Sequence, residues 1–512
     1  MPEQLFQNIK NKILPQWKVC FFSAILFGLA AHLYKITNWL PNWDSLVFRY
    51  DNQNMLAMGR WFLPVACAPS SFYDLPLVTG LLAILFGALG AVCICRMFGV
   101  QKKITAAMIG GLVATFPTVT SVMMYQYVAD GYAMAFFFSA MAAMLLSNKK
   151  PNYVWAIILI ALSSGIYQAY ITVTVMLLLA YLIVELIKKE TTVKESLLHS
   201  LKFLIAGAVG MGLYYLMMTL LLKLTGTSML AYQGFDDATS LSGINIPGAL
   251  YVIKHSFTDY FFDFSGGANF FSIFNCIIFG VTVLLYLWNV ISNRLGIGKL
   301  LLLCVYVVFL PVGASVLAII NSNLDYHNLM RMGFLVFYLF LILQYEGFQI
   351  PCAKWQTAKV WTVLLLVAIL IFQYIVIANV GYHKLNMAYE KSYGTLVRMA
   401  DRIEQTDGSA DCTRIVIIGN LPQSESYTVN LPPDLTGTTD GLILRADDEI
   451  VGQSVVCSAL NDYCGTNYTF LYGDEKQAFL QNETVMQMGC WPEKDSVAVM
   501  DGVIVIKLSV ER

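Results

Sequence analysis

Charged side chains are scarce in this 512-residue sequence. Charged side chains make up 13% of the residues against 57% hydrophobic ones, a ratio that excludes an ordinary soluble enzyme and is typical of a polytopic membrane protein. Several motifs are missing as well, because the sequence contains no P-loop, no dinucleotide-binding fingerprint, no nucleophile elbow and no repeat of fixed period. The candidates for chemistry are therefore the polar groups between the apolar segments.

Long apolar segments recur from Val19 to about Val380. A hydrocarbon core about 30 Å thick requires about twenty apolar residues per helix, and the chain supplies about eleven such segments. We predict a polytopic α-helical membrane fold with spans near 19–34, 75–95, 104–123, 131–146, 153–166, 169–187, 201–222, 270–290, 300–320, 329–345 and 360–380. The first segment lacks a small-residue cleavage site, which predicts a retained helix rather than a signal peptide.

The distribution of Lys and Arg predicts the orientation of these spans. Cytoplasmic turns are enriched in basic residues, and most basic residues here fall on the side that also holds the N-terminus. This places the N-terminus inside and residues 381–512 outside. The basic residues that fall on the outer side are Lys35, Arg49, Arg60, Lys223, Lys254 and Arg331. Because the rule does not expect them there, they are candidate functional residues.

Residues 381–512 are predicted to form a small extracytoplasmic α/β domain after a transmembrane domain of residues 1–380. Charges become frequent and net acidic there, which argues against binding of polyanions such as nucleic acids. Residues 384–405 carry apolar side chains at helical spacing and are predicted to continue the last span. The β-branched stretches 414–419, 496–500 and 503–508 predict strands.

Cysteines and acidic pairs bear on disulfides and metals. The cysteines of the second domain are Cys412, Cys457, Cys464 and Cys490. They would form two disulfides of unknown pairing in an oxidising exterior, or else remain buried thiols, and the sequence leaves both open. The spacing of Cys457 and Cys464 does not match a zinc site. Asp236 and Asp237 are weak candidates for a divalent cation, because a bare acidic doublet is more often solvated, so no cofactor is predicted with certainty.

The first outer loop, residues 42–64, crowds Asp44, Arg49, Asp51 and Arg60 between two apolar segments. Carboxylates and guanidinium groups at a membrane surface suit a site in which an acid-base group and a phosphate-binding cation face one cavity. The alternative is an interfacial loop anchored by its tryptophans, Trp39, Trp43 and Trp61. We favour anchoring for the tryptophans and function for the charges.

Two further outer turns carry polar candidates. Asp130 is the only charged residue in the turn 125–132, where it would be either an N-cap of the next span or a catalytic group. Tyr167 and Gln168 occupy a turn with almost no loop, where they would be sugar ligands or satisfied interfacial groups.

The loop 321–331 contains His327 and Arg331 at the spacing of one α-helical turn. Both side chains would then point into one site and would suit a phosphate. The alternative is a capping histidine beside an arginine that extends toward the interface.

A family resemblance joins these scattered candidates. It is carried by NWDSL (42–46), YDNQNMLAMGRWFLPVAC (50–67), SSFYDLP (70–76), ATFPTV (114–119), YVADGYAMA (127–135), GIYQAY (165–170), AYEKSYGTLVRMADRIEQ (388–405) and RIVIIGN (414–420). These stretches, which span most of the chain, resemble the Gtr-type (type II) membrane glucosyltransferases that decorate bacterial surface polysaccharides. That family is similar to the broader GT-C class. The sequence departs from the family pattern at Asn42-Trp43, where a histidine is expected near Asp44.

The resemblance implies a sugar donor linked to polyprenyl phosphate and an acid in the first outer loop as catalytic base. By position, it favours Asp44 over Asp51 as that base. The other residues that it places around the site are Arg60, Asp130, Tyr167, Gln168, His327 and Arg331.

The expected protein transfers a sugar, glucose by resemblance, to a cell-surface glycan on the outer face of the bacterial cytoplasmic membrane. Asp44 would accept the proton of the acceptor hydroxyl while arginine neutralises the departing lipid phosphate, with inversion because no dedicated nucleophile is present. The competing prediction is a lipid-sugar transporter or flippase. Such proteins often have repeated halves and broken helices near the bilayer midplane, and the sequence shows neither in obvious form.

Overall fold

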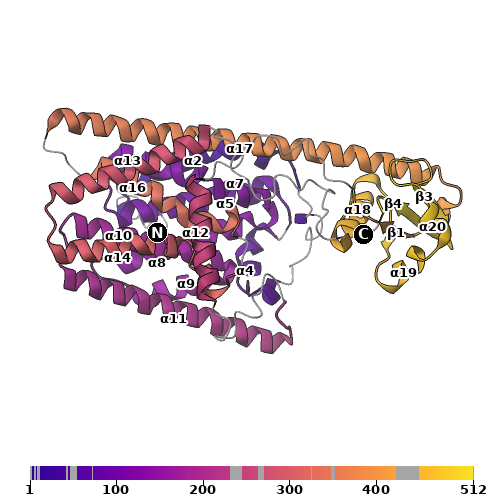
Figure 1. Ribbon diagram of the computed structural model, residues 1–512, viewed down its shortest axis with the longest axis horizontal. Helices are drawn as coiled ribbons and strands as arrows, with labels where there is room; N and C mark the ends of the chain where they lie inside the picture. The colour runs from indigo at the N-terminus through magenta and orange to yellow at the C-terminus, as the bar shows by residue number, and fades with distance from the viewer. Residues whose placement is uncertain are drawn as a thin grey trace. The chain divides into compact units, whose positions relative to one another are not determined.

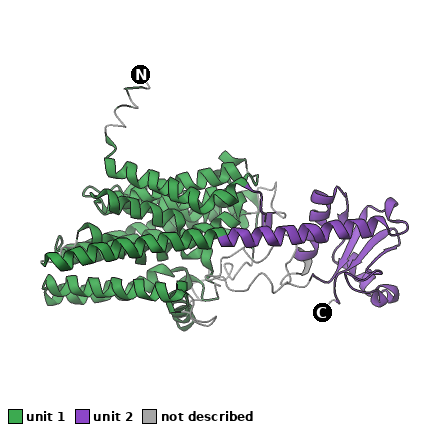
Figure 2. Ribbon diagram, turned by 90° about the horizontal axis from the view of Figure 1, so that it is seen from above, with its two compact units in different colours: residues 1–37, 52–379, 432–436 green, residues 38–51, 380–431, 437–512 purple. Residues whose placement is uncertain are grey.

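The computed structural model describes residues 12–41, 44–45, 55–71, 73–230, 245–262, 270–323, 326–347, 352–421 and 449–510, together with 3–4 and 7. The predicted site residues Arg49, Asp51, Asp236 and Asp237 lie outside these ranges. The chain divides into two compact units, shown in Figure 2. Unit 1 comprises Met1–Thr37, Asn52–Asn379 and Pro432–Thr436, and unit 2 comprises Asn38–Asp51, Val380–Leu431 and Gly437–Arg512.

Within the described residues, ten helices are long and apolar enough to cross a membrane (Figure 1). They are α2 (Pro15–Thr37), α5 (Pro76–Met97), α6 (Lys103–Thr115) with α7 (Pro117–Met124), η3 (Gln126–Val128) with α8 (Ala129–Ser147), η4 (Gln168–Tyr170) with α10 (Ile171–Ile187), α11 (Val193–Thr225), α13 (Phe270–Ser292), α14 (Ile297–Ala314), η7 (Asn328–Phe334) with α16 (Leu335–Glu346), and α17 (Ala353–Glu404). The remaining predicted span, 153–166, corresponds to α9 (Tyr153–Ile166), which is apolar but shorter than the other ten. The chain is therefore a multi-pass membrane protein.

Local chemistry explains where several of these helices begin and end. Pro117 lacks an N–H and holds the preceding residue, Phe116, at an extended ψ of 138°, so α6 stops there and α7 starts. Across 245 residues of sequence, the Glu346 carboxylate accepts the backbone N–H of Gln101 at 2.7 Å. The same carboxylate accepts the Thr105 hydroxyl at 2.6 Å, and in this way satisfies donors at the start of α6.

Small residues let the first helices of unit 1 approach closely. Ala24, Ala88 and Ala114 form a buried cluster between α2, α5 and α6. A Cβ added to Gly110 would overlap the Cys20 carbonyl oxygen, so only glycine fits where α6 crosses α2. In lipid, where apolar contact between helices has little hydrophobic driving force, such close packing supplies the attraction that holds the bundle together.

The stretch between α11 and α13 contains a further helix, α12 (Ile246–Phe262). Its buried residues are Ala249, Ile253, Ser256, Tyr260 and Phe261, which lie on one helical face. The opposite face exposes Leu250 and Tyr251. Figure 1 shows α12 running across the direction of α11 and α14. This helix was not predicted from the sequence, and at 17 residues it is shorter than a membrane span.

Helix α17 is 52 residues long and includes all but the last of residues 384–405, so the prediction that the last span continues as a helix is confirmed. The division between the two units falls within this helix, after Asn379. In unit 2 its C-terminal part contributes Leu396, Met399 and Ile403 to a buried core.

Unit 2 contains a four-stranded sheet in the order β2-β1-β4-β3. The elements are β1 (Arg414–Ile418), β2 (Thr469–Phe470), β3 (Val497–Met500) and β4 (Val503–Lys507), with helices α18 (Glu449–Cys464), α19 (Asp474–Leu480) and α20 (Glu483–Gln487). Strands β1, β2 and β4 are parallel, and β3 joins β4 as an antiparallel hairpin through Asp501 and Gly502, both at positive φ. The predicted strands are confirmed, whereas the short β2 was not predicted.

Both faces of the central strands β1 and β4 are buried, as expected where parallel strands are covered by helices. Ile415 and Ile417 of β1 face the core formed with α17 and α18, and Val416 and Ile418 face the core formed with α19 and α20. The Lys507 ammonium at the end of β4 donates to three carbonyl oxygens at the C-terminal end of α20, at 2.8 to 3.1 Å. The predicted cysteines, Cys412, Cys457, Cys464 and Cys490, are free thiols, so the disulfide alternative is not adopted in the structure.

Candidate functional site

A tight turn places Arg60 in unit 1. The turn follows η1 (Met55–Met58), with the Arg60 N–H donating to the Met55 carbonyl at 2.8 Å. Gly59 has φ +73°, and a Cβ added there would lie 2.6 Å from the Tyr214 hydroxyl and 2.8 Å from the Gln168 amide nitrogen. Both the backbone angle and the crowding require glycine immediately before Arg60.

Arg60 is partly exposed and sits among aromatic rings. Its Nη1 donates to the Tyr132 hydroxyl at 3.1 Å, and its guanidinium carbon lies 4.9 Å from the centre of the Tyr167 ring. The Tyr132 and Tyr167 rings stack on each other at 4.8 Å with an interplanar angle of 6°. We call Arg60, Tyr132 and Tyr167 the arginine cage. It holds a permanently charged fork by a cation–π contact and a hydrogen bond.

Gln168 braces the turn that carries Arg60. Its amide nitrogen donates to the Met58 carbonyl at 2.9 Å and to the Tyr214 hydroxyl at 3.0 Å. The structure thus brings together Arg60, Tyr167 and Gln168, which the sequence proposed from separate stretches. Tyr132 and Tyr214 were missed because a tyrosine in an apolar helix carries no signal of the residue that it meets.

The tryptophans of the first outer loop have protein partners. The Trp61 indole packs on Gly165, where an added Cβ would lie 2.7 Å from it, and the neighbouring Phe62 N–H donates to the Gly165 carbonyl at 2.8 Å. Trp39 stacks on Tyr463 within unit 2. Trp43 lies outside the described residues.

Asp130 is buried, with 1% of its surface exposed. The N-cap of α8 is Val128, so the N-cap prediction for Asp130 was wrong by two residues. Asp130 lies instead in the first turn of α8, where its carboxylate accepts the Gly131 N–H at 2.9 Å and complements the helix dipole. A carboxylate this buried offers almost no surface to an acceptor hydroxyl.

Arg331 lies within η7, a 3₁₀ element that is kinked at this residue, and His327 immediately precedes the element. In a 3₁₀ helix residues three apart share a face, so the premise that these two residues occupy one α-helical face was wrong. His327 is the N-cap residue of η7, but its side chain makes no capping hydrogen bond. The guanidinium carbon of Arg331 lies 5.9 Å from the centre of the Tyr260 ring of α12.

Tyr260 begins a buried polar cluster below Arg331. The Tyr338 hydroxyl donates to the Asn275 side-chain oxygen, and its oxygen lies 3.3 Å from the Tyr260 hydroxyl, which can donate to it. The Asn275 amide nitrogen donates to the Tyr260 carbonyl at 2.9 Å. Sequence reasoning missed this cluster, because its members come from α12, α13 and α16 and meet only in the fold.

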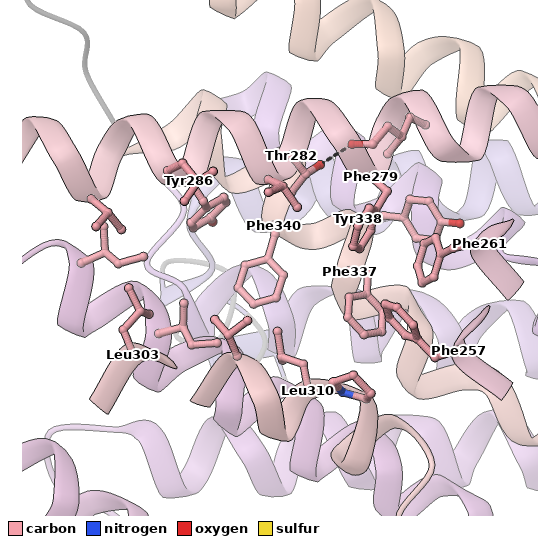
Figure 3. A pocket seen from close by; sticks show the side chains of 18 residues that line it. Phe257, Phe261, Phe279, Thr282, Tyr286, Leu303, Leu310, Phe337, Tyr338 and Phe340 are labelled. Atoms are coloured by element: carbon pink, nitrogen blue, oxygen red, sulfur yellow. Dashed lines mark hydrogen bonds between the residues drawn. The ribbon is translucent and has the colours of Figure 1, made fainter. Parts of the chain in front are cut away.

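An apolar cavity of about 320 Å³ adjoins this cluster. Figure 3 shows its lining side chains, which come from α10, α12, α13, α14 and α16 and include Phe257, Phe261, Phe337 and Tyr338. Phe261 packs edge-on against Tyr260, with 4.9 Å between the ring centroids, and the Arg331 guanidinium lies over the Tyr260 ring. The wall of the cavity therefore continues through Tyr260 to a cation.

Arg60 and Arg331 both adjoin a pair of elements of unit 1 that pack against each other. Element η4, which directly follows Tyr167, packs against η7, which contains Arg331. Asp44 belongs to unit 2, where it is half-buried and adjoins the fully buried Ser45. Among the described residues, no group of three or more His, Cys, Asp or Glu side chains is placed to hold a metal ion.

A comparison with protein-family models matches residues 33–344 to the family described as Glucosyl transferase GtrII. The chain belongs to the GtrII glucosyl transferase family. The matched region covers more than half of the chain and contains Asp44, the arginine cage and η7. The GtrII match ends before α17, so it does not extend to the sheet of unit 2. No curated protein and no solved structure matches the chain.

Proposed function

We propose that this GtrII protein transfers glucose from a polyprenyl-phosphate donor to a cell-surface glycan on the outer face of the bacterial cytoplasmic membrane. The observation that carries the proposal is the continuity in unit 1 from an apolar cavity, through Tyr260, to a positive charge on Arg331. An amphiphile with a long hydrocarbon chain and an anionic headgroup matches that arrangement. Membership of a glucosyl transferase family in a multi-pass membrane protein supports the same donor class.

The donor's parts fit different features of unit 1. The apolar cavity would take part of the isoprenoid chain, since its lining is almost entirely aliphatic and aromatic. Arg60 would bind the phosphate as a bidentate fork, with Arg331 as a second cation. Tyr132 and Tyr167 limit the freedom of Arg60, so little side-chain entropy is lost when it binds.

Asp44 is the proposed general base, with Asp51 of the same loop as the alternative base and Arg49 as a further ligand for the donor phosphate. Asp44 takes the proton of the acceptor hydroxyl as the oxygen forms a bond to the anomeric carbon. The bond from that carbon to the phosphate oxygen breaks, and its electron pair leaves with the lipid phosphate. Arg60 and Arg331 neutralise the charge that develops there. A single displacement of this kind inverts the anomeric carbon, and the leaving phosphate needs no protonated acid.

The test is a transfer assay with the full chain in lipid nanodiscs. Polyprenyl-phosphate [¹⁴C]glucose is supplied with candidate surface glycans, and the expected result is loss of label from the lipid and its appearance in the glycan. A lipid-sugar flippase would move the donor across the bilayer without consuming it. Reorientation of intact donor in proteoliposomes, with no transfer to any acceptor, would replace our proposal with that alternative.

A further inference from the structure

Most of the chain between α2 and η1 belongs to unit 2. Residues Asn38–Asp51 belong to unit 2, although the residues on either side of them belong to unit 1. Within this segment, Leu40 and Ser45 are almost completely buried, at 2% and 0% exposure. A loop that only connected two membrane helices would have no reason to bury such positions.

Aromatic rings hold this segment in unit 2. The Trp39 ring stacks on Tyr463 of α18 with 5.7 Å between centroids and an interplanar angle of 21°. Tyr463 in turn packs edge-on against Tyr389 and Tyr393 of α17, at 6.0 and 6.3 Å. We call Trp39, Tyr389, Tyr393 and Tyr463 the aromatic clamp. It joins three parts of the chain that are far apart in sequence.

We infer that unit 2 is a positioning part of the catalytic machinery, in which the aromatic clamp fixes the segment that carries Asp44. The inference rests on the proposed role of Asp44 as base. Trp39 and Asp44 belong to the same short segment of unit 2, so stacking of the Trp39 ring on Tyr463 tethers the segment that carries Asp44. A general base must lie within hydrogen-bond reach of the proton that it removes, and a small displacement of such a group costs a large factor in rate.

This inference accounts for two features that the donor site leaves unexplained. It supplies a role for the C-terminal part of the chain, which lies beyond the GtrII match. It also explains why Trp39 faces a ring of α18 when anchoring at the membrane surface would need no protein partner. Trp39 and Tyr463 are positioning residues in this account, because neither touches the reacting atoms.

The first arm of the test measures hydrogen exchange in peptides covering residues 38–45 of the full chain in nanodiscs. Tyr463→Ala should raise exchange there by roughly tenfold, the factor for loss of one strong aromatic pair. Tyr463→Phe keeps the ring and should leave exchange unchanged. The matched control is Tyr472→Ala, which removes a tyrosine of unit 2 that is 67% exposed and outside the clamp. Unchanged exchange in Tyr463→Ala overturns the inference, whatever the activity.

The second arm measures transfer and donor binding in the same variants. We expect kcat to fall about tenfold in Tyr463→Ala while the donor Kd stays constant, with full activity in Tyr463→Phe and Tyr472→Ala. Raised exchange with normal kcat would overturn the positioning role. Trp39→Ala repeats both arms without touching the core of unit 2, in case Tyr463→Ala prevents folding. If the wild-type protein transfers nothing from the lipid donor, the proposed function is wrong. The hydrogen-exchange arm would still show whether the aromatic clamp restrains the segment.

Discussion

At the residue scale, Asp44 and an asparagine in its place would fill the same volume, but only the carboxylate can take a proton. We predict that Asp44→Asn abolishes transfer while membrane insertion and melting temperature stay near those of the wild type. Asp51→Asn should cause a milder loss in the same assay. If the order of the two variants reverses, the base is Asp51, and near-normal turnover of both would remove the acids of this loop from the role of base.

Arg60 is expected to bind the donor phosphate through its planar fork, which lysine cannot reproduce. Arg60→Lys should weaken donor binding by about tenfold to a hundredfold, the factor for loss of one or two charge-assisted hydrogen bonds, and Arg60→Ala should weaken it further. The control is Tyr132→Phe, which removes only the hydroxyl that accepts from Arg60 and should cost less. The measurement is donor Kd beside melting temperature. Normal binding with a lowered melting temperature would make Arg60 a brace of the loop.

The ionisation of the Cys457 thiol should make the stability of unit 2 depend on pH. Burial raises the pKa of its thiol from 9.0 to about 11. The neutral thiol therefore contributes stability that is complete below pH 9 and is lost as the pH rises through 11. At pH 8 we expect iodoacetamide to modify Cys457 about a hundredfold more slowly than an unshifted thiol, by site-resolved mass spectrometry. Rapid modification of Cys457 in folded protein would contradict this.

At the scale of elements, the turn between η1 and α4 (Leu63–Cys67) depends on Gly59. Gly59→Ala should destabilise the protein by about 1–2 kcal/mol from the left-handed backbone alone, with a further cost from contact with Tyr214 and Gln168. Gly87→Ala is the matched control, because a Cβ there meets nothing within 4 Å. Gly59→Ala should lower the melting temperature and raise the donor Kd. Gly87→Ala should change neither quantity. Equal behaviour of the two variants would remove the turn from the account of the site.

Some helices and strands of the structure can be predicted from the local sequence pattern, and others cannot. The helix over residues 384–405 and the strands β1, β3 and β4 follow from spacing and β-branching, which act over a few residues. The 3₁₀ form of η7 and the transverse helix α12 do not follow in this way. Whether a segment is wound as α or 3₁₀, or lies across a bundle, depends on the neighbours that it packs against.

At the scale of the whole molecule, the Lys and Arg distribution predicts which side of the membrane each end occupies. An impermeant maleimide added to intact cells should label an introduced thiol at Tyr472→Cys, a position that is 67% exposed, but not the exposed native Cys352. Labelling of both sites after the membrane is opened is the control. Labelling of Cys352 alone in intact cells would invert the topology and with it the outward-facing site.

The sequence by itself determined that the chain is a multi-pass membrane protein with a GtrII resemblance and a C-terminal α/β part, because hydrophobicity and strand propensity are local properties. Only the tertiary structure decided that Arg60 meets Tyr132, 72 residues away, and that Phe261 in the wall of the apolar cavity contacts Tyr260, which in turn contacts Arg331. Only the structure placed Asn38–Asp51 in unit 2. The physical reason is the same in each case: contacts between distant segments form when helices pack, and the residue types along one segment carry no record of their partners.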